Sequence, residues 1–182
     1  MKNLIMVRNA FFLLLLSGFF LPRILKAQDE SQEKLLNESK LAKESFLKGD
    51  PSMANLFKNS HGYVIFPNVG KGAVGVGGAA GRGIVYERGN PIGIAHMTQV
   101  SVGAQAGGQA YREVIFFESK DALDRFTHNK VEFDAQTSAI AVKSGASANA
   151  NYREGVVVFS QEKGGLMVEA SLGGQKFSFK PF

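Results

Sequence analysis

The sequence contains no cysteine, no tryptophan and only five prolines among its 182 residues. The absence of cysteine excludes a disulfide framework, a zinc–cysteine site, an iron–sulfur cluster, a thiol nucleophile and a lipidated N-terminal cysteine. Charged residues are also scarce, at 20%, whereas 45% of the residues are hydrophobic. A chain of this length and composition can bury a core, and we therefore expect one globular domain rather than a disordered chain.

Residues 1–27 have the pattern of a secretory signal peptide. Lys2 and Arg8 precede an uninterrupted apolar run over residues 10–21. This run is shorter than the roughly 20 residues that a membrane-spanning helix needs, and it suits the apolar core of an export signal. We expect cleavage after Ala27 and export to a bacterial periplasm or envelope. An uncleaved membrane anchor and a buried core segment remain the alternatives.

The positive charge of the chain comes largely from this N-terminal segment. The full sequence has 21 basic and 16 acidic residues, and its formal net charge is +5. Residues 1–27 hold four of the basic residues and no acidic one, so the chain without them has a net charge of +1. Binding to nucleic acid requires a positive surface on the folded part. A nearly neutral mature chain gives no reason to expect a nucleic-acid partner.

Residues 28–49 predict an N-terminal amphipathic helix. Leucines recur with Ala42 and Phe46 near helical spacing, charged residues lie between them, and Gly49 is expected to end the helix. The apolar stripe would suit either a membrane surface or packing on the rest of the domain. We favour packing, because residues 28–58 hold five basic and six acidic residues and so offer no attraction to an anionic surface.

A second, shorter helix is expected directly after this one. Asp50 is placed to cap it, and Pro51 suits the first helical position because a proline there loses no intrahelical hydrogen bond. Met53 and Phe57 would then lie on one apolar stripe of the helix.

Beyond residue 59 the composition predicts a glycine-rich sheet. Tyr63–Phe66 is β-branched and aromatic, as in a strand, and Pro67 is expected to close it. Seven glycines then fall between residues 70 and 83. Glycine within strands marks bulges, corners or close contact between layers, so we expect a strongly curved, barrel-like antiparallel sheet.

The remaining pattern predicts a single α+β domain. Residues 119–130 break the strand pattern and predict one inserted helix, with Ser119 as its cap. Strand character returns afterwards, and no stretch has the composition of a linker. We therefore expect a signal peptide over residues 1–27, an amphipathic helix over residues 28–49 and one domain over residues 50–182.

The search for catalytic and ligand-binding motifs is mostly negative. Residues 75–80 formally satisfy a G-x-G-x-x-A dinucleotide fingerprint, but the residues that follow have strand character where that motif needs a helix. The histidines His61, His96 and His128 are isolated, with no second ligand at metal-binding spacing. We therefore predict no catalytic residue, no metal site and no cofactor, and a protein that is not an enzyme.

Three stretches, in this order, resemble the SYLF family of lipid-binding domains. Residues 56–86 read LFKNSHGYVIFPNVGKGAVGVGGAAGRGIVY, residues 103–119 read GAQAGGQAYREVIFFES, and residues 154–175 read EGVVVFSQEKGGLMVEASLGGQ. The resemblance covers roughly residues 50–182. The family includes bacterial secreted and lipoprotein members and eukaryotic actin-patch and endocytic members.

The resemblance implies binding of membrane lipid through basic residues toward the N-terminal end of the domain. We do not transfer the actin-patch functions of the family to this chain, because an exported protein would meet neither cytosolic phosphoinositides nor actin. The residues of this chain that match such a role are Lys40, Lys43, Lys48, Lys58, Lys71 and Arg82.

We therefore expect a non-catalytic, exported bacterial domain that binds phospholipid membranes. The alternative is a structural or protein-interaction module of the envelope without lipid dependence, in which the glycine-rich sheet presents an edge or a groove to a partner. An envelope hydrolase is a third class, against which the missing nucleophile motifs speak.

Overall fold

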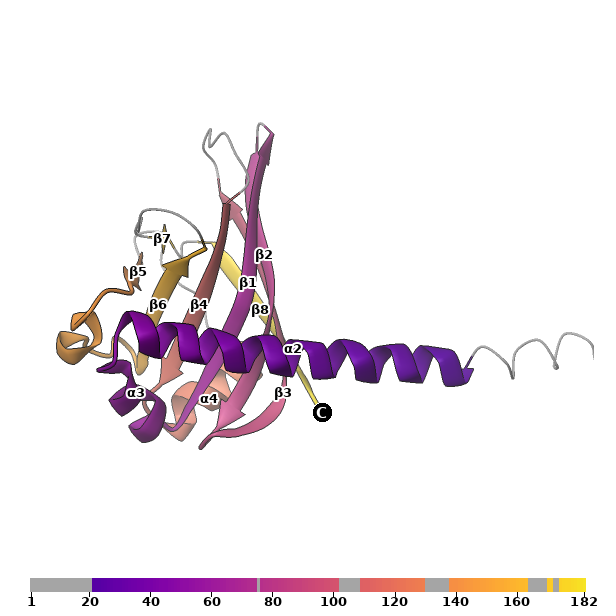
Figure 1. Ribbon diagram of the computed structural model, residues 1–182, viewed down its shortest axis with the longest axis horizontal. Helices are drawn as coiled ribbons and strands as arrows, with labels where there is room; N and C mark the ends of the chain where they lie inside the picture. Colours follow the sequence, from indigo (N-terminus) through magenta and orange to yellow (C-terminus); the bar gives the residue numbers. More distant parts are fainter. Residues whose placement is uncertain (1–20, 75, 102–108, 130–137, 164–169, 172–173) are drawn as a thin grey trace, which may run out of the picture. The chain divides into compact units, whose positions relative to one another are not determined.

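The computed structural model describes residues 21–74, 76–101, 109–129, 138–163, 170–171 and 174–182 (Figure 1). Its elements, in chain order, are α2 (Leu21–Gly49), α3 (Met53–Asn59), β1 (Gly62–Val74), β2 (Val76–Glu87), β3 (Asn90–Ser101), β4 (Gln109–Phe117), α4 (Lys120–Thr127), β5 (Ser138–Ala141), the 3-10 turn η1 (Ala146–Asn149), β6 (Val156–Glu162), β7 (Ala170–Ser171) and β8 (Gln175–Pro181).

The chain divides into two compact units, Met1–Leu36 and Asn37–Phe182, and each is considered by itself. In the first unit the described residues form the first part of α2, which begins at Leu21 and therefore extends before the predicted start at residue 28. The helix ends at Gly49, as predicted. Most of the predicted signal peptide lies outside the described residues. None of the helices within the described ranges is long and apolar enough to cross a membrane.

The second unit is built on one sheet. Its described strands follow the order β7-β5-β6-β4-β1-β2-β3-β8. Neighbouring strands are antiparallel except β5 and β6, which are parallel. The α+β class is thus confirmed, although the sheet is mixed where a purely antiparallel one was expected. Helix α4, capped by Ser119, whose hydroxyl accepts a hydrogen bond from the Ala122 amide at 3.3 Å, confirms the predicted inserted helix.

The sheet curls strongly. Four strand spacings separate β4 from β8, which would be about 19 Å in a flat sheet. The Gln175 amide on β8 nevertheless donates a hydrogen bond to the Glu113 carboxylate on β4 at 3.1 Å. The rings of Phe66 and Phe177, three strand spacings apart, lie 6.0 Å from each other. In the described residues β7 and β8 are edge strands that do not pair with each other, so the sheet is an open half-barrel, and the barrel-like expectation is confirmed only in part.

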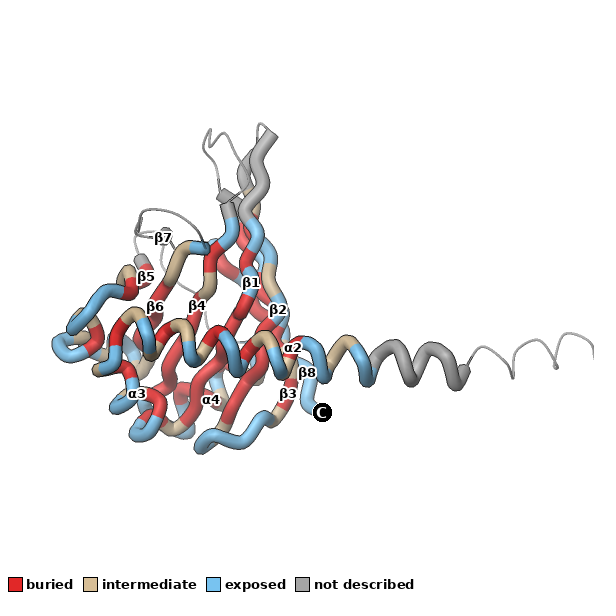
Figure 2. The backbone as a smooth tube through the Cα atoms, viewed as in Figure 1, coloured by how far each residue is buried: buried red, intermediate tan, exposed pale blue. Residues whose placement is uncertain are grey.

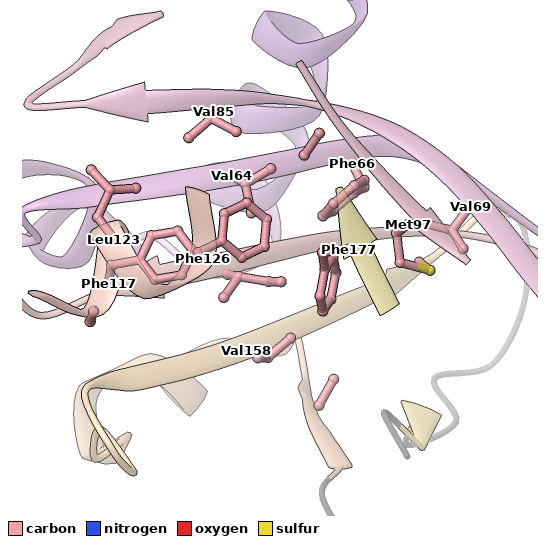
Figure 3. Close-up of a cluster of buried hydrophobic side chains, with 14 of the residues drawn as sticks. Val64, Phe66, Val69, Val85, Met97, Phe117, Leu123, Phe126, Val158 and Phe177 are labelled. Atoms are coloured by element: carbon pink, nitrogen blue, oxygen red, sulfur yellow. The ribbon is translucent and has the colours of Figure 1, made fainter. Parts of the chain in front are cut away.

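The inner face of this curve holds the main hydrophobic core. Rings from β4, α4 and β8 converge there: the Phe126 ring centroid is 4.9 Å from that of Phe117 and 5.1 Å from that of Phe177. Figure 3 shows these rings with Val64 and Val158 around them. Fully burying an aromatic or aliphatic side chain stabilises a protein by about 1.5–3 kcal/mol, so this cluster accounts for much of the driving force that keeps the sheet curled.

The opposite, outer face is covered by α3 and by the part of α2 that lies in the second unit (Figures 1 and 2). Ser39 accepts a hydrogen bond from the Tyr86 hydroxyl on β2 at 3.0 Å, and Ser45 donates one to Gln161 on β6 at 2.8 Å. Ala42, between these two contacts, and Phe46, directly after the second, are buried. The helix therefore crosses the strands and packs on the sheet, as the sequence favoured.

A bulge in β1 corrects one expectation about strand ends. Pro67 was expected to close the strand, but β1 continues through it to Val74. The pairing of β1 shifts between Ile65 and Asn68 on one side and between Phe66 and Val69 on the other. A bulge leaves a residue outside the ladder, so a proline that has no amide hydrogen can be accommodated there. The same bulge turns Asn68 toward the outer face, where it contacts Glu38 of α2.

The junction between α2 and α3 corrects another expectation. Asp50 is not the cap of a helix that starts at Pro51: α3 starts at Met53 after Ser52. The buried Asp50 carboxylate instead accepts hydrogen bonds from the Ser52 amide at 3.1 Å and from the amides of Gly145 and Ser147 at 3.0 and 2.7 Å. Asp50 thereby ties the helix junction to the turn η1, about 95 residues further along the chain.

Candidate functional site

Three of the predicted lipid-binding residues are exposed on the helices. Lys40 and Lys48 lie on α2, and Lys58 lies in the last turn of α3. Their charges face solvent and are available to a partner. They lie on different turns of two helices, and no contact joins them into a compact site in the described structure.

Lys43 occupies a different environment from the other helix lysines. Its ammonium donates a hydrogen bond to the Tyr63 hydroxyl at 3.2 Å and lies 4.7 Å from the centre of the Phe57 ring and 5.2 Å from that of Tyr63. Burial lowers the pKa of Lys43 below its usual value. A cation held over aromatic rings in this way stabilises the packing of α2 and α3 on the sheet.

The other two predicted residues lie on the sheet. Lys71 is on β1, opposite Ala79 and Gln109, and its side chain lies outside the described part of the structure. Arg82 is exposed on β2, opposite Asn68 of β1 and His96 of β3. Alternation along β2 places it on the outer face, since the neighbouring Ile84 and Tyr86 lie on the side that α2 covers.

Strand pairing brings two further cations to the same level of the outer face. Arg112 on β4 lies opposite Gln161, whose side chain contacts α2, and Lys163 follows β6 and pairs through its amide with the carbonyl of Ala110 at 3.0 Å. Lys163 also donates a hydrogen bond from its ammonium to the side-chain oxygen Oδ1 of Asn68. We call Arg82, Arg112 and Lys163, with Asn68 at their centre, the basic row.

The cations of the basic row influence one another. Burial lowers the pKa of Arg112, and burial followed by repulsion from Arg112 lowers the pKa of Lys163, while Glu38 acts in the opposite direction. Glu38 of α2 contacts the row through a 3.1 Å hydrogen bond from the Asn68 side-chain amide. Arg112 and Lys163 are thus close enough to repel each other, and an anion placed between them would lower the electrostatic energy.

The sequence identified only part of this row. Arg82 was predicted, whereas Arg112 was not among the predicted residues. Lys163 lies more than 80 residues beyond Arg82, and only the pairing of β6 with β4 brings it to the same surface. No spacing signal along the chain could have indicated it.

Two of the three histidines contact a neighbouring residue in the described structure. His61 forms a 3.0 Å hydrogen bond with Glu87, and His128 contacts the Asp124 carbonyl oxygen at 2.7 Å as it ends α4. His96 is exposed beside Arg82. Among the residues whose placement is described, no group of three or more potential metal ligands is found.

The SYLF-like motifs coincide with structural elements where they are described. Residues 56–86 form the end of α3 and the strands β1 and β2, which excludes the helix that a dinucleotide fingerprint would need. The motif Gly103-x-Gln105-x-Gly107, with Gly165 and Gly173, lies outside the described residues. The fold and its surface together define a small α+β domain with a curled mixed sheet and a basic row on the outer face.

Comparison with known proteins identifies the family. Residues 98–181 match the family Ysc84, described as "Las17-binding protein actin regulator". The chain is also 27% identical, over 169 residues, to beta cell expansion factor A of Aeromonas veronii, in an alignment that covers 84% of this chain and 64% of that protein. The resemblance to the SYLF family is therefore confirmed over residues 98–181, the part of the chain that matches the Ysc84 (SYLF) family.

Proposed function

We propose that this protein is a non-catalytic domain that binds anionic phospholipid membranes through cations on its outer face. The observation that carries the proposal is the SYLF family match, since the family is associated with lipid binding. The exposed residues Lys40, Lys48, Lys58 and Arg82 support it, because basic groups are attracted to an anionic leaflet, by up to about 1 kcal/mol each where they lie close to it.

We also propose that the protein works outside the cytoplasm, in a bacterial envelope. The basic and apolar pattern of residues 1–27 supports export. An exported protein meets anionic membrane lipid but no cytosolic actin, so an actin partner is not part of the proposal. Mass determination of the N-terminus of the protein from a bacterial envelope fraction should give a chain that starts at Gln28, whereas a cytoplasmic chain that starts at Met1 would contradict export.

Co-sedimentation of the purified full chain with vesicles tests the lipid-binding proposal. Phosphatidylcholine vesicles are compared with vesicles in which part of the lipid is phosphatidylglycerol. We expect more protein on the anionic vesicles than on the zwitterionic ones at low salt, because the cations are attracted only by the former. No binding to either vesicle would defeat the proposal and favour the protein-interaction module.

A further inference from the structure

The basic row spans several strands on the outer face of the curled sheet. Lys163 follows β6, Arg112 is on β4, Asn68 is on β1 and Arg82 is on β2, and these four strands are consecutive neighbours in the sheet. Three strand spacings amount to about 14 Å. A row of this width exceeds a single phosphate group and can meet more than one phosphate at once.

The surface next to the row is exposed and nearly free of bulky side chains. Toward the β1–β2 hairpin, the next outer-face positions are Gly70, Ala80, Thr98 and Ala110, which are all exposed. A Cβ atom built on Gly70 would have no neighbour within 4 Å. Figure 2 shows this exposed part of β1 and β2 beyond the point at which α2 crosses the sheet. No bulky side chain at these positions therefore keeps a partner away from the backbone beside the row.

The side chains of the row are also positioned in advance. Asn68 accepts from Lys163 and donates to Glu38, so it holds a cation on one side and a helix carboxylate on the other. Arg112 is partly buried, which limits the conformations of its guanidinium. Little conformational entropy is then lost when an anion binds, in contrast to the exposed lysines of α2 and α3.

From this arrangement we propose that Arg82, Arg112 and Lys163 form the site that holds the phosphates of anionic phospholipid headgroups when the outer face docks on a membrane. This inference rests on the proposed function and assigns it to one surface. Guanidinium groups suit phosphate oxygens because they can donate two parallel hydrogen bonds. The helix lysines then contribute long-range attraction rather than contact.

Two triple variants of the full chain separate this site from the helix lysines. Arg82→Gln/Arg112→Gln/Lys163→Gln neutralises the row, and Lys40→Gln/Lys48→Gln/Lys58→Gln removes the same total charge from α2 and α3. Partition onto phosphatidylglycerol-containing vesicles, relative to phosphatidylcholine vesicles, is measured for both and for the wild type. We expect the row variant to lose on the order of a hundred-fold in affinity and the helix variant less than tenfold.

A single variant serves as a control for misfolding of the triple variant. Arg82→Gln changes one exposed side chain, and we expect it to retain the circular dichroism spectrum of the wild type and to lose roughly five-fold in affinity. Equal losses in the two triple variants, or a larger loss in the helix variant, would contradict the assignment of the phosphate site to the basic row. The proposed function would still stand. No preference of the wild type for anionic vesicles would overturn both.

The same assay distinguishes a membrane from a soluble phosphate compound. Glycerol phosphate is added as a competitor that carries the phosphate group without the bilayer. We expect weak competition, because a single soluble phosphate meets only part of the row. Full displacement of the protein from anionic vesicles by glycerol phosphate at millimolar concentration would contradict docking on a membrane and indicate a soluble phosphoester as the ligand.

Discussion

Asp50 shows how one side chain can join distant parts of the chain. Its carboxylate accepts hydrogen bonds from the amides of Ser52, Gly145 and Ser147 and from the Ser52 hydroxyl at 2.5 Å. Burial by itself raises the pKa of Asp50, but the hydrogen bonds from Ser52, Ser147 and Gly145 outweigh it and lower the pKa to about 2. The ionised form is therefore the form that stabilises the fold.

We predict that Asp50→Asn lowers the free energy of unfolding by about 1–3 kcal/mol at neutral pH, because an amide nitrogen would face donors that need an acceptor. The folded pKa lies below the unfolded value, so this contribution is fully present above about pH 4 and is lost as the pH falls toward 2. Urea denaturation of the wild type and the variant at several pH values measures the difference.

Asp124→Asn provides the matched control for this variant. Asp124 also has a lowered pKa, mainly because it accepts a hydrogen bond from Lys120, but the pair is exposed on α4. Exposed pairs contribute little to stability, so we expect almost no change in the free energy of unfolding. A difference between wild type and Asp50→Asn that is no larger than that of the control, or that does not shrink in acid, would contradict the role assigned to Asp50.

Among the elements, the β1–β2 hairpin shows that the glycines of this sheet have different roles. A Cβ atom on Gly83 would lie 2.6 Å from the Ile65 carbonyl oxygen and 2.8 Å from the Phe66 ring. At Gly70, on the neighbouring strand, the same atom would meet nothing within 4 Å. Gly83 permits a close approach between strands at the β1 bulge. Gly70 only leaves a position on the outer face without a side chain.

We predict that Gly83→Ala lowers the free energy of unfolding by about 1–3 kcal/mol, because backbone atoms must shift to accept the methyl group. Gly70→Ala should be neutral or stabilising by up to about 1 kcal/mol, since alanine restricts the unfolded chain. Thermal and urea unfolding of the two variants measure the contrast. Equal stability of both variants would show that the bulge does not hold β1 and β2 as tightly as described.

The elements also show how far the sequence predicts this fold. Local signals identified the end of α2 at Gly49, the Ser119 cap of α4 and the strand character of the glycine-rich stretch. Local signals were insufficient at Pro67, where a bulge lets the strand continue, and at Asp50, whose partners near η1 are set by tertiary contacts. The parallel pairing of β5 with β6 is likewise a property of the whole sheet.

The candidate site likewise depends partly on local sequence signals and partly on tertiary contacts. The family resemblance indicated Arg82, but the side chain that completes the row, Lys163, reaches it through strand order alone. Conversely, Lys43 appears in the sequence as one more helix lysine, while the structure holds it over the rings of Phe57 and Tyr63. Charge can be counted from a sequence, but its distribution over a surface depends on the fold.

At the scale of the whole molecule, a nearly neutral domain presents a localised positive surface. The net charge of the chain after residue 27 is only +1, yet three cations gather on the outer face around Asn68. The proposed attraction to an anionic membrane would therefore depend on this local surface rather than on the total charge. Such attraction is screened by salt, because the Debye length is about 10 Å at 0.1 M ionic strength.

The dependence of vesicle binding on salt tests this account most directly. The full chain is titrated with phosphatidylglycerol-containing vesicles at increasing sodium chloride concentration. The account predicts binding at low salt that weakens steadily as the ionic strength passes about 0.1 M, with little binding to phosphatidylcholine vesicles at any salt concentration. Absence of binding at low salt, or equal and salt-independent binding to both vesicles, would contradict it.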